Sequence, residues 1–337
     1  MKVFTDNPII KNFITQNNYS DAAKSLFEIQ AKEWPMLKTG VSTLETVKVK
    51  SFQFDGFKIK AQFNAGRMTS TSAKVDPKSI SERKCFLCIE NLPDEQRGFL
   101  FNHNYIVLCN PFPIFPEHFT IAHKEHLPQR IIDTFPDMLD LSKNLTKHYS
   151  VIYNGPRCGA SAPDHLHFQA GNKFFMPVDD EFHQLKNEYG EEIFEDDNIS
   201  VFAIDDGLRK FISIESLDKD LILKTFNKFY RTYSDLMKEE QEPLMNLAGF
   251  YEEEYGWRVI IFLRAKHRPA VFFAEDESKM LVSPASIDLG GVCVFPREED
   301  FNRITKEQIA DIFKEVFVDR NIFMKLTKTF KLQLSDI

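Results

Sequence analysis

The stretch CGASAPDHLHFQAG, at residues 158–171, carries the side chains of this chain that are best suited to chemistry. His165, His167 and Gln169 alternate there with apolar residues, which is the period of a β-strand with one buried and one open face. Successive members of such a row lie roughly 7 Å apart on one face of the strand. Imidazole is a good nucleophile and titrates near neutral pH, so this row could attack an electrophilic substrate. The alternative is a hydrogen-bonded row of surface side chains.

The loop before this predicted strand is built from small residues. Gly159, Ala160 and Ser161 let a ligand approach the backbone closely. Asn154 and Arg157 lie just upstream, and Arg157 is a candidate to supply positive charge in this loop. The loop therefore favours a ligand-binding role for the strand that follows it.

A pair of cysteines has the spacing of metal ligands. Cys85 and Cys88 form a C-x-x-C motif, but no second C-x-x-C follows. Two histidines, His123 and His126, come next along the chain, and His165 after them. The two interpretations are a metal site and a pair of buried thiols in an aromatic loop.

Two further segments are candidates for ligand contacts. RAKHRP supplies Arg264, Lys266 and Arg268 directly after the predicted strand WRVIIFL, and alternation would place these three side chains together. A solvated charge cluster is the alternative. SPASIDLGG, at residues 283–291, has the composition of an ordered loop near a site, or equally of a plain turn.

Composition limits the classes of function. The 337 residues carry a formal charge of −8, which argues against a general nucleic-acid binder. No apolar run approaches the length of a membrane span, and the opening MKVFTDNPIIKNF lacks the apolar core of a signal peptide. Five cysteines in a chain of this size do not suggest a disulfide framework, so we expect a reducing, cytoplasmic setting.

The predicted elements repeat along the chain. Both halves give strand, strand, helix, strand, strand, which predicts an α+β protein with a duplicated unit. We place the two halves at residues 1–185 and 186–337. The elements are YIVLCN, HFTIAH, QRIIDTFPDMLDLSKNLTKH, YSVIYN and DHLHFQA in the first half, and ISVFAID, KFISIES, DKDLILKTFNKFYRTYSDLMKEE, NLAGFYEEE and WRVIIFLR in the second. The last of these occupies the place of the histidine strand but has no histidine, so only the first copy would keep the chemistry.

The segment NGPRCGASAPDHLHFQ resembles the histidine-triad superfamily, in the branch that holds galactose-1-phosphate uridylyltransferase, diadenosine tetraphosphate phosphorylase and GDP-L-galactose phosphorylase. Members carry an Asn, a Gly-x-Ser and a His-x-His-x-Gln, which here are Asn154, Gly159, Ser161, His165, His167 and Gln169. The resemblance is specific over 154–169 and extends more loosely across 60–300. It implies a duplicated histidine-triad-like unit, with antiparallel sheets and helices packed on one face. An inserted residue in NGPRCGAS, relative to the uridylyltransferases, leaves the loop geometry and the substrate open.

The resemblance implies that His167 attacks the α-phosphorus of a nucleotide sugar or dinucleoside polyphosphate and forms a covalent nucleotidyl-histidine. Phosphate or a sugar phosphate would then accept the nucleotidyl group. Ser161 and Gln169 could stabilise charge on the phosphoryl oxygens. Hydrolases of the superfamily usually have a third histidine where this chain has Gln169, which cannot titrate, so we favour transfer or phosphorolysis. The alternatives are a hydrolase of the same substrates and a catalytically silent, zinc-stabilised nucleotide-binding protein.

The resemblance also implies a structural Zn²⁺ site. In zinc-binding uridylyltransferases the ligands are a C-x-x-C, one histidine after a strand and the first histidine of His-x-His. Here those residues are Cys85, Cys88, His126 and His165, with His123 as the substitute for His126.

Two more segments resemble the nucleotide-binding parts of the family. NAGRMTSTSAK, at residues 64–74, is similar to the segment by which relatives hold the nucleotide, and this implies Arg67 and Lys74 as contacts. NPFPIFPEHFTI, at residues 110–121, is similar to the strand pair that lines the base pocket, which implies Asn110. The identity of the base and the oligomeric state stay open.

Overall fold

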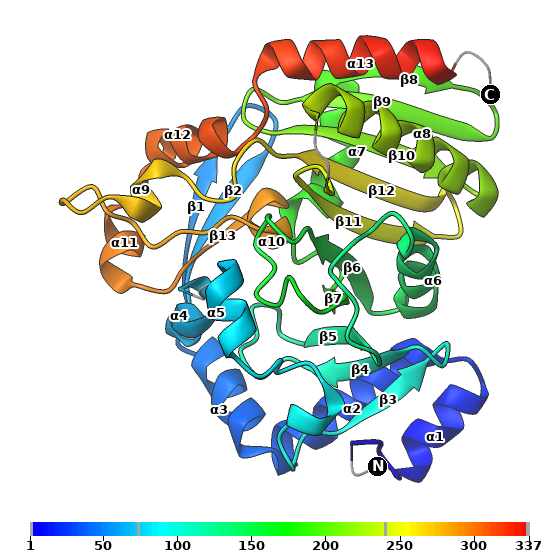
Figure 1. Cartoon of the computed structure of the whole chain (residues 1–337), viewed down its shortest axis with the longest axis vertical. Helices are drawn as coiled ribbons and strands as arrows, with labels where there is room; N and C mark the ends of the chain where they lie inside the picture. Colours follow the sequence, from blue (N-terminus) through cyan, green and yellow to red (C-terminus); the bar gives the residue numbers. More distant parts are fainter. Residues whose placement is uncertain (1–2, 73–74, 239–240, 335–337) are drawn as a thin grey trace.

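The fold is given by a computed structural model, which describes residues 3–72, 75–238 and 241–334. In these residues ten strands form one antiparallel sheet that runs the length of the molecule (Figure 1). In spatial order they are β3 (Gly98–Phe101), β4 (Tyr105–Cys109), β5 (His118–His123), β7 (His167–Asn172), β6 (Tyr149–Asn154), β11 (Met245–Glu252), β12 (Gly256–Leu263), β10 (Lys210–Ser216), β9 (Ile199–Asp205) and β8 (Gly190–Glu195).

The predicted duplication is confirmed by the order of the strands. β4, β5, α6 (Phe135–Leu145), β6 and β7 form the first unit, and β9, β10, α8 (Lys219–Met237), β11 and β12 form the second. The units meet where β6 pairs with β11, with Asn154 opposite Asn246. β12 takes the place in the second unit that β7 takes in the first. The division at 185/186, which falls within α7 (Pro177–Tyr189), stays our proposal.

One face of the sheet is covered by long amphipathic helices. α6 and α8 pack there as expected, and the rings of Phe135 and Phe226 stack with their centroids 3.7 Å apart. α2 (Tyr19–Glu33) and α13 (Arg320–Leu334) extend this layer, and α1 (Pro8–Thr15) and α3 (Pro35–Leu44) flank α2. Burial of the apolar stripes of these helices accounts for most of the first core.

The other face of the sheet carries the remaining helices and a small second sheet. A hairpin of β1 (Lys48–Gln53) and β2 (Lys58–Phe63), predicted from the Asp-Gly turn, pairs in parallel with β13 (Val292–Phe295). α7 and α12 (Lys306–Val316) pack beside it. The short helices are α4 (Met68–Thr71), α5 (Pro77–Glu82), α9 (Ala270–Phe273), α10 (Ser286–Leu289) and α11 (Glu298–Arg303), with 3₁₀ turns at Ala65–Arg67 and Ile89–Asn91. None of the helices within the described residues has the length and apolar character that a membrane span requires.

Candidate active site and metal cluster

The histidine strand lies near the centre of the large sheet and presents its two sides to different environments. Phe168 and Ala170 are fully buried in the core beneath the helices. His167 and Gln169 point to the opposite side, where they line a cavity of about 610 Å³. His167 is only 4 % exposed, so the predicted open face is the wall of a cavity, not a free surface.

The ring of His167 is held in one tautomer. Its Nδ1 lies 2.8 Å from the carbonyl oxygen of His165, and because a carbonyl can only accept, Nδ1 must carry the proton. Burial lowers the pKa of His167 to about 4, so the ring is neutral near pH 7. The lone pair is therefore on Nε2, which has no hydrogen bond to the described residues and belongs to a ring that lines the cavity.

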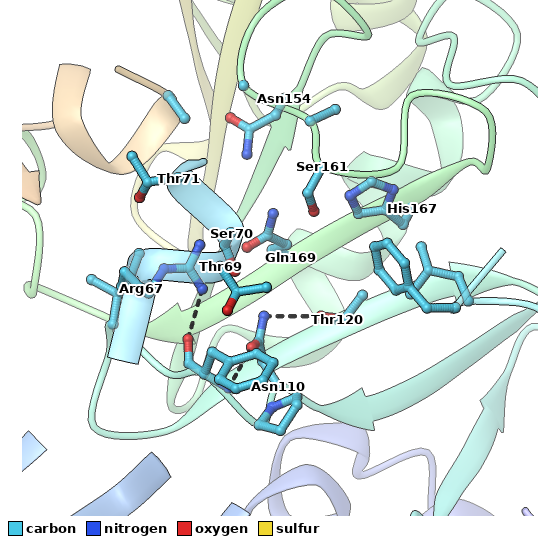
Figure 2. A pocket seen from close by; sticks show the side chains of 18 of the residues that line it. Arg67, Thr69, Ser70, Thr71, Asn110, Thr120, Asn154, Ser161, His167 and Gln169 are labelled. Atoms are coloured by element: carbon cyan, nitrogen blue, oxygen red, sulfur yellow. Dashed lines mark hydrogen bonds between the residues drawn. The ribbon is translucent and has the colours of Figure 1, made fainter. Parts of the chain in front are cut away.

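Three polar groups converge beside this ring. Figure 2 shows the amide nitrogens of Asn154 and Gln169 and the hydroxyl of Ser161 pointing toward one another next to His167. All of them line the cavity. Gly159 turns the chain toward Ser161 with a φ of +94°, and a Cβ at this position would lie 2.6 Å from Cβ of Ala285. Glycine is therefore required both by the turn and by the packing.

Gln169 is oriented by a buried histidine. The backbone N–H of Ile114 donates to Nδ1 of His118 at 3.2 Å, so the proton of this ring is on Nε2. Nε2 in turn donates to Oε1 of Gln169 at 2.8 Å. This leaves the amide nitrogen of Gln169 as a donor toward the cavity. Burial, together with the charge of Arg67, lowers the pKa of His118 to about 3 and keeps the ring neutral.

The candidate cations separate into two groups. Arg67 and Arg268 line the cavity, where Arg67 donates to the carbonyl oxygen of Phe112 at 2.7 Å and Arg268 donates to Oγ of Ser283 at 3.0 Å. Burial lowers the pKa of Arg67 to about 10, which leaves it charged at neutral pH. Lys74 lies outside the described residues.

Arg157, Arg264 and Lys266 do not line the cavity. Arg157 donates to the backbone oxygen of Glu242, and Arg264 is fully buried with its bonds directed to Asn246 and three carbonyl groups. Lys266 forms an exposed ion pair with Glu315. Because these side chains are turned away from the cavity, the structure does not support them as direct substrate contacts.

The cavity also has an apolar part of its lining, which we define by the residues Trp34, Met36, Phe86, Leu87, Leu92, Pro93, Leu108 and Phe112. Asn110 also lines the cavity and is fixed by a bond from its amide nitrogen to Oγ1 of Thr120 at 3.2 Å and by one from the backbone N–H of Phe112 to its Oδ1 at 3.0 Å. A cavity with both polar and apolar lining suits a ligand that carries phosphates and a flat ring.

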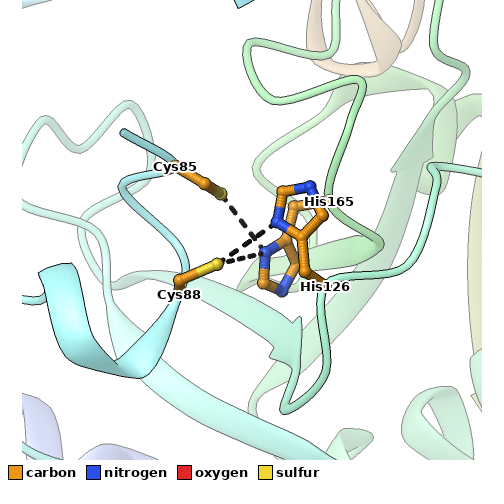
Figure 3. Close-up of side chains that lie close together, drawn as sticks. All are labelled: Cys85, Cys88, His126 and His165. Atoms are coloured by element: carbon orange, nitrogen blue, oxygen red, sulfur yellow. Dashed lines mark hydrogen bonds between the residues drawn. The ribbon is translucent and has the colours of Figure 1, made fainter. Parts of the chain in front are cut away.

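A second cluster lies at the start of the histidine strand. Ligand atoms of Cys85, Cys88, His126 and His165 all lie within 4.8 Å of one another. Figure 3 shows both sulfur atoms and both imidazole rings facing a common point. Sγ of Cys85 lies 3.3 Å from Nδ1 of His165, and Sγ of Cys88 lies 3.2 Å from Nδ1 of His126. Two thiols and two imidazoles are the donor set of a structural zinc site, so these residues fit the metal.

The hydrogen bonds around this cluster also suit a metal. Nε2 of His165 donates to the carbonyl oxygen of His123 at 2.7 Å, which leaves the lone pair of Nδ1 directed at the sulfur atoms. Burial opposes ionisation of Cys85, but its contacts with His165 and with the backbone of Leu87 and Cys88 lower its pKa to about 6. Nδ1 of His123 lies within hydrogen-bond distance of the backbone of Glu125, and this histidine is not part of the cluster.

The comparisons with known proteins agree with this architecture. Residues 26–172 match the family model "Domain of unknown function (DUF4922)", and residues 231–336 match "GDPGP1-like, C-terminal domain". Among curated proteins, no sequence matches this chain. The crystal structure of the yeast Ap4A phosphorylase Apa2 is 14% identical, covers 83% of this chain and 97% of its own, and superposes with a TM-score of 0.56. The same yeast protein in complex with Ap4A is matched at 12% identity, with 87% and 97% covered and a TM-score of 0.55.

The match of residues 231–336 to the GDPGP1-like domain and the fold shared with the yeast phosphorylase agree with each other. Together they support the resemblance to the uridylyltransferase and phosphorylase branch of the histidine-triad superfamily. The identity to the yeast structures is low, so these structures show a shared fold.

Several residues at or beside the site are not indicated by any pattern in the sequence. Gln129 is buried against His167, and Asp288 and Trp34 line the cavity from distant parts of the chain. Asp288 accepts from the backbone N–H groups of Val294 and Ala285 at 2.9 Å, and burial raises its pKa to about 6. The composition of the segment 283–291 predicts an ordered loop or a plain turn, but nothing in its own pattern indicates which strand it packs on.

Proposed function

We propose that this protein is a nucleotidyltransferase or phosphorylase that works through a covalent nucleotidyl-histidine on His167. The observation that carries the proposal is the free Nε2 of this ring beside three converging donors from Asn154, Ser161 and Gln169. Such donors would stabilise negative charge on the oxygens of a phosphoryl group under attack. Arg67 and Arg268 would add positive charge to the same wall.

The proposed reaction has two displacements. Nε2 of His167 attacks the α-phosphorus, so an N–P bond forms while the bond to the leaving polyphosphate or sugar phosphate breaks. The bond from Nδ1–H to the carbonyl oxygen of His165 supports the positive ring of this intermediate. An oxygen of inorganic phosphate or of a sugar phosphate then attacks the same phosphorus, the N–P bond breaks and the lone pair returns to Nε2. Splitting one displacement into two lowers the individual barriers.

The polar and apolar lining of the cavity and the family resemblance support one class of substrate. We propose a nucleotide sugar or a dinucleoside polyphosphate, with its base in the apolar part of the cavity. Gln169 offers no titrating group to activate water, which favours phosphate or a sugar phosphate as acceptor. Hydrolysis of the same substrates is the second candidate, and a silent nucleotide-binding protein is the third.

We propose that Cys85, Cys88, His126 and His165 hold a structural Zn²⁺. The ion would fix the loop of the C-x-x-C motif to the start of the histidine strand and keep the backbone of His165 in place. The five cysteines of the chain are all free, which supports a reducing compartment such as the cytoplasm.

Intact mass spectrometry tests the proposed function. The protein is incubated with Ap4A, with GDP-sugars and with UDP-sugars, with and without phosphate. A mass gain of one mononucleotide that is absent in His167→Ala supports the covalent step and identifies the base. Turnover that requires phosphate or a sugar phosphate supports transfer, and turnover in water alone supports the hydrolase. Nucleotide binding without any mass gain or turnover would support the silent protein.

A further inference from the structure

β12, which takes the place of the histidine strand in the second unit, has no histidine, yet the second unit reaches the site of the first unit through a buried series of hydrogen bonds. Arg264 directly follows the last residue of β12. Asn246 is the second residue of β11, and Asn154 is the last residue of β6. Nη1 of Arg264 lies 2.5 Å from Oδ1 of Asn246, and Nδ2 of Asn246 lies 2.8 Å from Oδ1 of Asn154. Arg264 and Asn246 are fully buried.

The donor and the acceptor of each hydrogen bond between Arg264, Asn246 and Asn154 are fixed by the chemistry of these side chains. A guanidinium only donates, so the atom of Asn246 that it contacts must be the oxygen. The nitrogen of Asn246 then faces Asn154, so the atom that it contacts there must also be an oxygen. The nitrogen of Asn154 is thereby turned toward the cavity, as Figure 2 shows. Nδ2 of Asn246 also donates to the carbonyl oxygen of Cys158 at 2.7 Å, which ties the loop before Ser161 to the second unit.

The loop 283–291 makes a second contact with the same oxygen. The backbone N–H of Ser286 donates to Oδ1 of Asn154 at 2.9 Å, and Oγ of Ser286 lies 2.7 Å from the same oxygen and 2.8 Å from the carbonyl oxygen of Tyr153. Nη1 of Arg264 also donates to the carbonyl oxygen of Pro284 at 3.0 Å, so the arginine holds this loop as well as Asn246. The charge of Arg264 interacts with the carboxylate of Asp288, which lines the cavity.

We propose that Arg264, Asn246 and Ser286 are positioning residues of the second unit, which hold the amide of Asn154 with its nitrogen directed at the phosphate of a bound nucleotide. The inference rests on the proposed function for its ligand. It gives the second unit, whose strand β12 has no histidine, a defined role in the reaction of the first unit.

The test is Asn246→Asp, which keeps the shape of the side chain but removes its donor group. An aspartate still accepts from Arg264 and gains an ion pair with it. It cannot donate to Asn154 or to the carbonyl oxygen of Cys158, and it attracts the amide nitrogen of Asn154 away from the cavity. The midpoint of thermal unfolding shows whether the variant stays folded. Loss of a hydrogen bond to a charged phosphate should weaken the binding of AMP or GMP by roughly ten- to a hundred-fold in calorimetry.

A double-mutant cycle separates positioning from general damage. In an Asn154→Ala background, Asn246→Asp should cause a clearly smaller loss of affinity, because only its contact with the loop at Cys158 remains. Ser286→Ala should give the same cycle with a smaller loss. The control Thr327→Val removes a buried hydroxyl bond in α13, far from the cavity, and should lower the midpoint of thermal unfolding without changing affinity.

Two results would overturn the inference. One is unchanged affinity in Asn246→Asp, and the other is an equal loss in both backgrounds. If the unmutated protein binds none of AMP, GMP and UMP, the proposed function fails first, and the inference falls with it.

Discussion

The backbone N–H of His167 donates to Oε1 of Gln129 at 2.8 Å, at the first residue of the histidine strand. The amide nitrogen of the same Gln129 side chain donates to the carbonyl oxygens of His167 and Asn154, at 3.0 Å and 2.9 Å. One buried amide thus joins the start of β7 to the end of β6. It fixes the distance between the proposed nucleophile and the donor of Asn154.

Replacement of Gln129 tests this bridge. Gln129→Leu leaves three backbone groups without their partner, which should cost about 2–3 kcal/mol in the free energy of unfolding. It should also slow nucleotidylation of His167, because the ring and Asn154 lose their common anchor. Urea unfolding and the rate of mass gain with Ap4A or a GDP-sugar measure the two effects.

A matched control lies in α2. Gln30 is equally buried and bonds to the backbone of Glu95 and Arg97. Gln30→Leu should lower stability by a similar amount but leave the rate of nucleotidylation unchanged in the folded protein. Equal slowing by both variants would show that the effect of Gln129 is only a loss of stability.

Removal of the metal forms the second prediction. The unmutated protein should contain one Zn²⁺ per chain by elemental analysis, and Cys88→Ser should contain none. Because a structural zinc adds its binding energy to folding, the variant should unfold at a lower temperature. The control Cys293→Ala removes a buried thiol outside the cluster and should keep the ion. A protein that purifies without zinc and does not take it up would contradict the proposed site.

Much of the fold could be predicted from the sequence because its signals are local. The alternation around His167 and the repeat of strands and helices are properties of short segments, and both agree with the structure. The placement of Cys85, Cys88, His126 and His165 in one cluster was implied by the family resemblance, since the spacing of the cysteines alone left the partner histidines open. The family's motif also led to Asn154, Ser161 and Gln169, which converge in the cavity.

The remaining parts of the site depend on contacts between distant segments. Arg264 and Lys266 were grouped by alternation, but Arg264 turns inward to meet Asn246, and a charge pattern carries no information about such a partner. Gln129 and Trp34 lie in segments without any motif. Only the packing of the chain brings Trp34 to the cavity and Gln129 to the backbone of His167.

The third prediction concerns the dependence of stability on pH. Burial raises the pKa of Glu242 from 4.5 to about 7, although its carboxylate accepts from the N–H of Ile131 and the hydroxyl of Tyr153. The folded state therefore holds this proton more tightly than the unfolded chain does. The contribution of Glu242 to the free energy of unfolding should fall as pH rises from about 4.5 to about 7, by up to about 3 kcal/mol, and level off above that range.

Glu242→Gln isolates this contribution. The variant cannot titrate at this position, so the difference between its free energy of unfolding and that of the unmutated protein should change between pH 5 and 8 in urea unfolding. Asp288, whose pKa burial raises to about 6, contributes in the same direction as Glu242, and His118 and His167 contribute in the opposite direction. These contributions are common to both proteins and cancel in the difference. An identical pH profile for the two proteins would contradict the shift.

The last prediction concerns the apolar part of the cavity, where the base of the nucleotide is proposed to lie. Phe86 and Phe112 line this part and are 47% and 36% exposed, so both rings are accessible to a ligand in the cavity. Stacking of a base on an aromatic ring is worth about 1–3 kcal/mol, so each replacement by alanine should weaken mononucleotide binding by roughly ten-fold. The fold should tolerate the changes because the rings are partly exposed. Phe273→Ala is the control, since that ring is 65% exposed and does not line the cavity. If Phe86→Ala and Phe112→Ala bind AMP and GMP as tightly as Phe273→Ala does, the base does not occupy this part of the cavity.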